Sequence, residues 1–128
     1  MENFKEYRRK ILYINQEIGK FGEDIATKYL QKKGYKIIER NFSCKQGEID
    51  IIAKDFSELV FIEVKTRTSK EYGNPAEAVN EIKKKHIETA AEYYLYKTKQ
   101  QNKFIRFDVI EVLMKNGYYT IKHIEQIK

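Results

Sequence analysis

Two short stretches decide the fold of this chain: EIDIIA at residues 48–53 and VFIEVKT at residues 60–66. Both are rich in aliphatic and β-branched residues, as buried strands are, yet both also carry charged side chains. A charged group inside an apolar strand must be paired, bound to a metal ion or used in chemistry, because burying an isolated charge is unfavourable. The positions of Asp50, Glu63 and Lys65 therefore indicate a site.

The alternation of side chains along a strand predicts which of these groups can meet. It places positions 48, 50 and 52 on one face of the first strand and positions 49, 51 and 53 on the other. In the second strand it places Glu63 and Lys65 on the same face. The polar segment 54–58 is short enough for a hairpin, so we expect Asp50 and Glu63 to come together in a cleft.

Length and composition limit the alternatives. With 128 residues, one proline and no repeat, we expect a single domain over residues 1–128. No apolar run approaches a signal peptide or a membrane span, and Cys44 is the only cysteine, so we expect a cytoplasmic protein with no membrane association and no disulfide. The net charge of +6 favours a polyanionic partner, namely nucleic acid, over a surface that is simply lysine-rich.

Hydrophobic periodicity and turn signals predict the order helix, three strands, helix, two strands. The predicted helices span residues 15–30 and residues 75 to about 99, the second starting from a capping pattern at Asn74-Pro75-Ala76-Glu77, with Pro75 in the first helical position. The predicted strands span residues 35–42, 48–53, 59–66, 104–112 and 118–124, with turns at residues 44–47 and 116–117. Glu23 lies at the edge of the first helix's apolar stripe, where the small residues Gly19 and Ala26 would permit close approach to another layer. The order predicts an α/β fold with a mixed sheet.

Two neighbouring carboxyl groups in a dry site can both be ionised only when a cation lies between them. Oxygen ligands favour Mg²⁺, with Mn²⁺ as the alternative, over zinc. Lys65 could then orient or deprotonate an attacking water, as phosphodiester hydrolysis requires. A cross-strand ion pair of Lys65 with Asp50 or Glu63 explains the same residues without any activity. The residues alone leave these two interpretations about equal.

Asp50 followed by Glu63-Val64-Lys65 on the next strand resembles the PD-(D/E)XK nuclease superfamily, whose fold is restriction-endonuclease-like. A closer resemblance, over nearly the whole chain, is to the bacterial YraN-like family of predicted endonucleases, which is similar to archaeal Holliday junction resolvases. It rests on Gly22-Glu23, Arg40-Asn41, Gly47-Glu48-Ile49-Asp50, Phe61-Ile62-Glu63-Val64-Lys65-Thr66-Arg67, Gly73, Ala78-Val79, Lys83 and Arg106-Phe107-Asp108-Val109. The proline that precedes the first aspartate in the superfamily's motif is replaced by Ile49.

The resemblance implies an α-β-β-β-α-β core with a mixed central sheet flanked by helices, and a C-terminal strand added to it. It also implies roles for individual residues. Asp50 and Glu63 would bind Mg²⁺ together with the main-chain carbonyl of Val64. Lys65 would act on the water, and Glu23 would contribute to catalysis from the first helix.

Three cations are candidates for nucleic-acid binding: Lys83, Arg67 and Arg40. For Lys83, contact with the site or with a phosphate competes with a lysine whose stem covers apolar surface. For Arg67, phosphate contact competes with an ordinary structural role. Asp108 is interpreted as a structural partner of Arg106 or Arg40, and His123 as a surface or packing residue.

The function expected from the sequence is Mg²⁺-dependent endonuclease activity on DNA, which is favoured over RNA, at branched or otherwise structured sites. The alternative is a non-catalytic, basic nucleic-acid-binding module or scaffold subunit of the same fold. A homodimer would suit an enzyme that makes two symmetric incisions at a junction.

Overall fold

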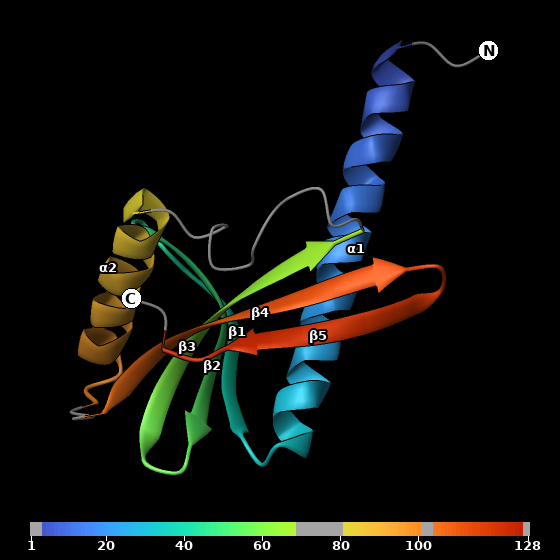
Figure 1. The fold of residues 1–128 in the computed structure, drawn as a ribbon. Helices are drawn as coiled ribbons and strands as arrows, with labels where there is room; N and C mark the ends of the chain where they lie inside the picture. The colour runs from blue at the N-terminus through green and yellow to red at the C-terminus, as the bar shows by residue number, and fades with distance from the viewer. Residues whose placement is uncertain (1–3, 69–80, 101–103, 127–128) are drawn as a thin grey trace.

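A computed structural model describes residues 4–68, 81–100 and 104–126 of the chain. Its helices are α1 (Phe4–Lys32) and α2 (Glu81–Lys97), and its strands are β1 (Lys36–Cys44), β2 (Gly47–Asp55), β3 (Glu58–Arg67), β4 (Ile105–Lys115) and β5 (Tyr118–Ile124). The order helix, three strands, helix, two strands confirms the predicted mixed α/β fold (Figure 1). No helix in these ranges is long and apolar enough to cross a membrane.

The strands form one five-stranded sheet in the order β1-β2-β3-β4-β5. The pairs β1–β2, β2–β3 and β4–β5 are antiparallel, whereas β3 and β4 are parallel. Parallel neighbours need a crossover connection, which here includes α2. The sheet is therefore mixed because a three-stranded meander is joined to a hairpin through this crossover.

The two helices cover opposite faces of the sheet (Figure 1). On the α1 face, Ile25, Ala26 and Leu30 pack against apolar side chains of the strands, including Ile51 and Ile62. On the other face, the α2 residues Ala90, Ala91 and Tyr94 pack against Phe42, Ile49, Ile52, Leu59 and Phe61. Because helices cover both faces of the three middle strands, side chains on both faces of these strands are apolar, as expected of a buried sheet.

The turns agree with the sequence. Phe56 and Ser57 join β2 to β3, and Asn116 and Gly117 join β4 to β5. Asn116 and Gly117 both have positive φ, 51° and 78°, which suits the tight hairpin turn that an Asn-Gly pair favours. The short β2–β3 hairpin fixes the register that places Asp50 close to Glu63.

The helix α1 differs from its prediction because it begins at Phe4 rather than near residue 15. Its first turns extend beyond the sheet (Figure 1), whereas an apolar stripe predicts only the part of a helix that packs on another layer. The predicted capping pattern of α2 at residues 74–77 lies outside the described residues. The described part of α2 ends at Lys97, within two residues of the predicted end.

The expected alternation along β2 is wrong at one position. Ile49 packs on the α2 face together with Ile52, whereas Ile51 packs on the α1 face. The β1–β2 register is the same on both sides of this level, at Arg40–Ile51 and Phe42–Ile49, and the register shift between these strands lies further along, between Ile37 and Glu39. Between the residues Arg40 and Phe42 of β1, Asn41 adopts a left-handed conformation with φ 54°, which asparagine tolerates better than most residues. The face reversal next to Asp50 thus lies beside a left-handed residue of the neighbouring strand.

Candidate active site

The candidate site lies where β2 and β3 separate. Their pairing runs from Asp55–Glu58 to Ile51–Ile62, and no pairing continues beyond it. From that point β2 stays with β1, while β3 continues alongside β4 (Figure 1). The opening is a cleft of about 520 Å³ lined by Ile18, Gly19, Glu23, Asp50 and residues 63–68.

Asp50 lies at the base of this cleft. Its Oδ2 accepts a hydrogen bond of 2.8 Å from the backbone N–H of Val64 on β3. Burial, followed by the negative charge of Glu63, raises the pKa of Asp50 to about 7, and the Val64 hydrogen bond only partly opposes this. The carboxyl group of Asp50 is therefore destabilised in its charged form and gains from any added positive charge.

Glu63 is 8% exposed and contacts both lysines of the site. Lys83 Nζ lies 2.5 Å from Glu63 Oε1, and Lys65 Nζ lies 3.5 Å from the same oxygen. Burial, and then the neighbouring Lys83, lower the pKa of Lys65. Burial, the largest single influence, would lower the pKa of Lys83 as well, but hydrogen bonding to Glu63 and Lys65 and the charges of Glu63 and Asp50 together outweigh it, so the pKa is raised. Lys65 is thus the lysine that gives up its proton more easily.

Helix α1 brings Glu23 to the same cleft through a very close approach to β3. A Cβ atom on Gly22 would lie 1.8 Å from Thr66 Oγ1, so only glycine fits there. Gly19, which we expected to permit close approach, has open space around it, whereas Ala26 is fully buried as expected. Burial raises the pKa of Glu23, even though Arg40 opposes this.

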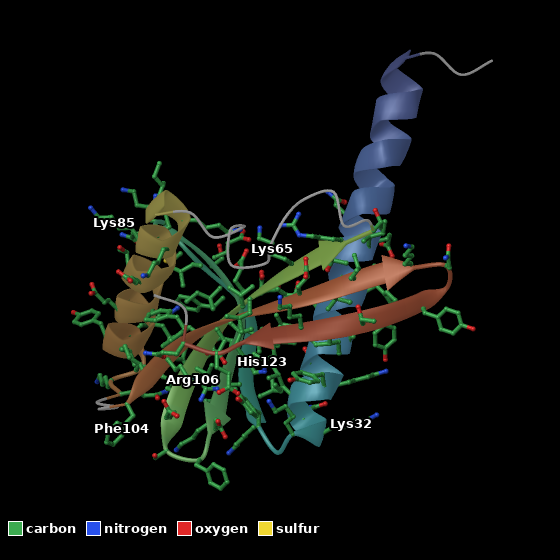
Figure 2. The ribbon with its side chains drawn as sticks, in the orientation of Figure 1. Lys32, Lys65, Lys85, Phe104, Arg106 and His123 are labelled. Carbon is green, nitrogen blue, oxygen red and sulfur yellow. The ribbon has the colours of Figure 1, made fainter. Side chains whose placement is uncertain are left out.

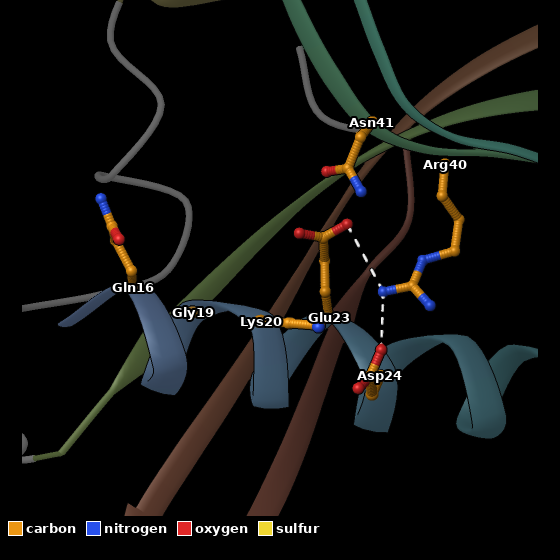
Figure 3. A pocket seen from close by; sticks show the side chains of 7 residues that line it. All are labelled: Gln16, Gly19, Lys20, Glu23, Asp24, Arg40 and Asn41. Carbon is orange, nitrogen blue, oxygen red and sulfur yellow. Dashed lines mark hydrogen bonds and ion pairs between the residues drawn. The ribbon is translucent and has the colours of Figure 1, made fainter. Parts of the chain in front are cut away.

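A second hollow adjoins the cleft on the side of α1 and β1, and Glu23 lines both (Figure 3). Here Arg40 NH2 lies 2.8 Å from Asp24 Oδ1 and 3.7 Å from Glu23 Oε1. The Glu23 oxygen is buried and accepts no hydrogen bond from the described part of the chain. Arg40 is therefore held between two carboxylates of α1 and reaches the margin of the site, as does Asn41.

The structure brings the predicted site residues together, most of them in the cleft itself and others at its edge. Asp50, Glu63, Val64, Lys65 and Glu23 all line one cleft, and Lys83 contacts it through Glu63. Arg67 also lines the cleft, where its Nε lies 3.1 Å from Glu111 Oε1 on the neighbouring strand β4. The Arg67–Glu111 pair was not predicted, because it depends on the pairing of β3 with β4 in this register, which no local pattern indicates.

Asp108 belongs to a different cluster, together with Arg106 and His123, which Figure 2 shows apart from Lys65. In the β3–β4 ladder Asp108 pairs with Ile62, three positions from the level of Lys65. Arg106 Nε donates to Asp108 Oδ1 over 2.9 Å, and His123 Nε2 lies 2.7 Å from Asp108 Oδ2. Burial would raise the pKa of Asp108, but these hydrogen bonds outweigh it and hold the pKa below its usual value. The structure thus assigns Arg106, not Arg40, as the partner of Asp108. His123 is buried in this network and packs against the rings of Tyr29 and Tyr35, which confirms the packing role among the two that we expected.

The donor set of the cleft fits a hard divalent cation. It consists of oxygens only: the carboxylates of Asp50 and Glu63, the carbonyl of Val64, and the buried, unsatisfied Glu23 Oε1 nearby. No group of three acidic, histidine or cysteine side chains close enough to hold a metal by themselves occurs in residues 4–68, 81–100 and 104–126. Two carboxylates are nevertheless typical of Mg²⁺, which retains several waters or takes phosphate oxygens as its other ligands.

The fold and the cleft together define the class of this protein: a small mixed α/β protein with an acidic and lysine-containing cleft where two central strands separate. The model of the family described as "Uncharacterised protein family UPF0102" matches residues 22–112. The chain belongs to this family. The matched segment includes Glu23, Asp50, Glu63, Lys65 and Lys83, so the acidic and lysine residues of the candidate site lie inside it.

Individual relatives agree with this assignment. A UPF0102 protein of Clostridium botulinum (strain 657 / Type Ba4) is 53% identical over 116 residues, which cover 88% of this chain and 94% of the relative. A UPF0102 protein of Caldicellulosiruptor saccharolyticus is 48% identical over 99 residues, covering 77% of this chain and 84% of the relative. The similarity thus extends over most of both chains.

Proposed function

We propose that this protein is a metal-dependent endonuclease that hydrolyses phosphodiester bonds in DNA, with Mg²⁺ as its cofactor and Mn²⁺ as a substitute. The observation that carries the proposal is the convergence of Asp50 and Glu63 where β2 and β3 part, with Lys65 Nζ 3.5 Å from Glu63. This arrangement supports membership of the PD-(D/E)XK superfamily and similarity to Holliday junction resolvases.

The residues of the cleft suit separate tasks in hydrolysis. Asp50, Glu63 and the Val64 carbonyl would hold the cation, which would supply Lewis-acid stabilisation of the charge that develops on the phosphate. Glu23 would hold a water or a further ligand from the α1 side, since its buried Oε1 has no hydrogen bond within the described residues.

Lys65 is the proposed group that acts on the attacking water. It stands two residues after Glu63 on the same strand and lines the cleft. A general base must be neutral to accept a proton, and burial together with Lys83 lowers the pKa of Lys65 toward that condition. The water would pass a proton to Nζ while its oxygen forms a bond to phosphorus. The bond from phosphorus to one sugar oxygen would break, and that oxygen would leave and take a proton from solvent water.

The proposed substrate is DNA with a branched or otherwise structured form. The net charge of +6 favours a polyanion, and Lys83, Arg67 and Arg40 all lie at or beside the cleft. A junction requires two symmetric cuts, so we propose that the protein acts on such DNA as a homodimer.

One observation favours the second candidate function, a non-catalytic module that binds nucleic acid. Lys83 and Lys65 already neutralise Glu63 without a metal ion. A binding module of this kind would hold DNA by its cations alone, so its affinity would fall steeply with salt and would not respond to a metal.

A cleavage screen separates the two functions. Linear, flapped, forked and four-way DNA, and an RNA control, would be incubated with Mg²⁺, Mn²⁺ or EDTA. We expect metal-dependent cleavage that falls at least about 100-fold in Asp50→Asn, Glu63→Gln and Lys65→Met, the scale of lost acid-base or electrostatic catalysis. Lys54→Met is the matched control, because Lys54 is exposed at the other end of β2.

The outcomes differ for each function. Cleavage that persists unchanged in Asp50→Asn and Glu63→Gln would refute the nuclease proposal for this cleft. Salt-sensitive DNA binding without cleavage, equal in EDTA and in Mn²⁺, would establish the binding module instead.

A further inference from the structure

We propose that Lys83 is a resident counter-ion of the cleft, and that a divalent cation binds by displacing the Lys83 ammonium group from Glu63. The inference rests on the metal requirement of the proposed function. It adds a competition between a side chain of α2 and the metal ion, and it gives Lys83 one position in the metal-free protein and another in the metal-bound protein.

The ion pair itself is the first argument. Glu63 is 8% exposed, and a carboxylate so poorly hydrated needs a compensating charge at all times. Lys83 supplies it at 2.5 Å, closer than Lys65 at 3.5 Å, and both lysines approach the same oxygen, Oε1. A metal ion that binds Glu63 would thus meet an ammonium group already held by one of its carboxylate oxygens.

The positions of the two lysines indicate which one leaves. Lys65 belongs to β3, two residues from Glu63, and its strand is fixed by pairing with β4. Lys83 comes from the opposite helix, α2, and its side chain is 35% exposed. A long side chain at that exposure can turn its ammonium group into water with little loss of hydration. Lys83 is therefore the exchangeable partner.

Charge balance favours the exchange. In the metal-free cleft, the carboxylates of Asp50, Glu63 and Glu23 face the two ammonium groups of Lys65 and Lys83. A divalent ion added to this set would give the cleft an excess of positive charge unless one ammonium group moved away. The displaced Lys83 would remain at the rim, where a DNA phosphate is an available partner. Metal binding would thereby convert a carboxylate-binding lysine into a phosphate-binding one.

The test measures Mn²⁺ binding to the full chain without DNA, by isothermal titration calorimetry and by the electron paramagnetic resonance signal of free Mn²⁺. Lys83→Met removes the competing charge and keeps the apolar stem. We expect it to bind Mn²⁺ about fivefold more tightly than wild type, which corresponds to about 1 kcal/mol. Lys83→Arg keeps the charge and should stay within about twofold of wild type.

Lys84→Met is the matched control. It makes the same charge change at the next residue, but Lys84 lines a separate surface of α2 with Ile82, Lys85 and Glu88. Its Mn²⁺ affinity should equal that of wild type. Glu63→Gln should abolish binding in both the wild-type and the Lys83→Met background. Circular dichroism verifies folding, and Lys83→Gln replaces Lys83→Met if the latter does not fold.

Failure of the inference and failure of the proposed function give different results. Mn²⁺ binding by wild type with equal affinity in Lys83→Met would overturn the exchange and leave the proposed function standing. Equal gains in Mn²⁺ affinity for Lys83→Met and Lys84→Met would also overturn the exchange, because they would reflect only the change in net charge. An absence of Mn²⁺ binding in wild type and in Lys83→Met, up to millimolar metal, would overturn both.

Discussion

The backbone N–H of Val64 donates a 2.8 Å hydrogen bond to the carboxylate of Asp50, at the point where the β2–β3 ladder ends. The Asp50 side chain on β2 thus accepts a hydrogen bond from a backbone N–H of β3. Without it, this N–H would have no partner on β2, because the two strands separate here. The bond fixes Asp50 beside Glu63, and the closeness of the two carboxylates has a measurable effect on stability.

Asp50→Asn should stabilise the metal-free protein at pH 8 by about 1–2 kcal/mol, because it removes a buried negative charge next to Glu63 while the Asn oxygen can still accept the Val64 hydrogen bond. The pKa of Asp50 in the folded protein, about 7, lies above its ordinary value of 3.8. Between these values the folded protein holds a proton that the unfolded chain has lost. Stability of the wild type should therefore fall as the pH rises from about 4 to about 7.

Urea unfolding in EDTA at pH 5 and pH 8 measures this effect. Asp50→Asn should show a smaller loss of stability between the two pH values than wild type does. Glu48→Gln, at an exposed position of the same strand, should behave like wild type. Identical pH slopes for wild type and Asp50→Asn would contradict the prediction.

Gly22→Ala should destabilise the protein by about 2–3 kcal/mol, the scale of an overpacked contact. The added Cβ would overlap Thr66 Oγ1, so α1 must move away from β3 and take Glu23 with it. An alanine within a helix normally stabilises by up to about 1 kcal/mol relative to glycine. The sign of the change in unfolding free energy therefore distinguishes a clash with Thr66 from the ordinary effect of alanine in a helix.

Gly19→Ala is the matched control for this substitution, because Gly19 lies one turn earlier with nothing within 4 Å of an added Cβ. Thermal unfolding should show a lower midpoint for Gly22→Ala and an equal or higher one for Gly19→Ala. Partial recovery in the double variant Gly22→Ala, Thr66→Ala would locate the clash. A higher midpoint for Gly22→Ala than for wild type would exclude the close approach.

Asp108→Asn should cost about 3 kcal/mol of unfolding free energy, because it leaves Arg106 and His123 without their buried anionic partner. The pKa of Asp108 is lowered in the folded state, so its contribution is present at neutral pH and is lost as the pH falls through its ordinary range and below. Chemical unfolding at pH 7 and pH 3.5 should show the difference between variant and wild type shrinking in acid.

Asp55→Asn offers a comparison within the same network, since Asp55 contacts the same guanidinium at 3.2 Å but is more exposed. It should change stability by less than about 1 kcal/mol. Equal losses of unfolding free energy in Asp55→Asn and Asp108→Asn would show that burial does not determine how much each carboxylate stabilises the protein.

The sequence predicted the elements around the cleft because their signals are local. Apolar runs and turn residues located β2, β3 and the hairpin between them, and strand spacing brought Asp50 and Glu63 together. The final hairpin at Asn116-Gly117 was confirmed for the same reason.

Other features depend on contacts between distant segments, which a periodic pattern does not contain. The contact of Gly22 with Thr66 requires the packing of α1 on β3, and the Lys83–Glu63 pair requires the docking of α2. The reversal at Ile49 lies beside the left-handed residue Asn41 of the neighbouring strand. The roles assigned to the cleft residues in catalysis and DNA binding stay predictions until the cleavage and binding experiments are done.

The parallel pairing of β3 with β4 also sets the order in which the molecule can assemble. The β1–β2–β3 meander closes through short turns, whereas β4 reaches β3 only after a long crossover, and closing such a loop costs more entropy and slows folding. Lys83 is part of that crossover, because it lies in α2. A nascent chain that has left the ribosome only as far as β3 would carry Asp50 and Glu63 without the helix that supplies Lys83, so the cleft is completed by one of the last long-range steps of folding.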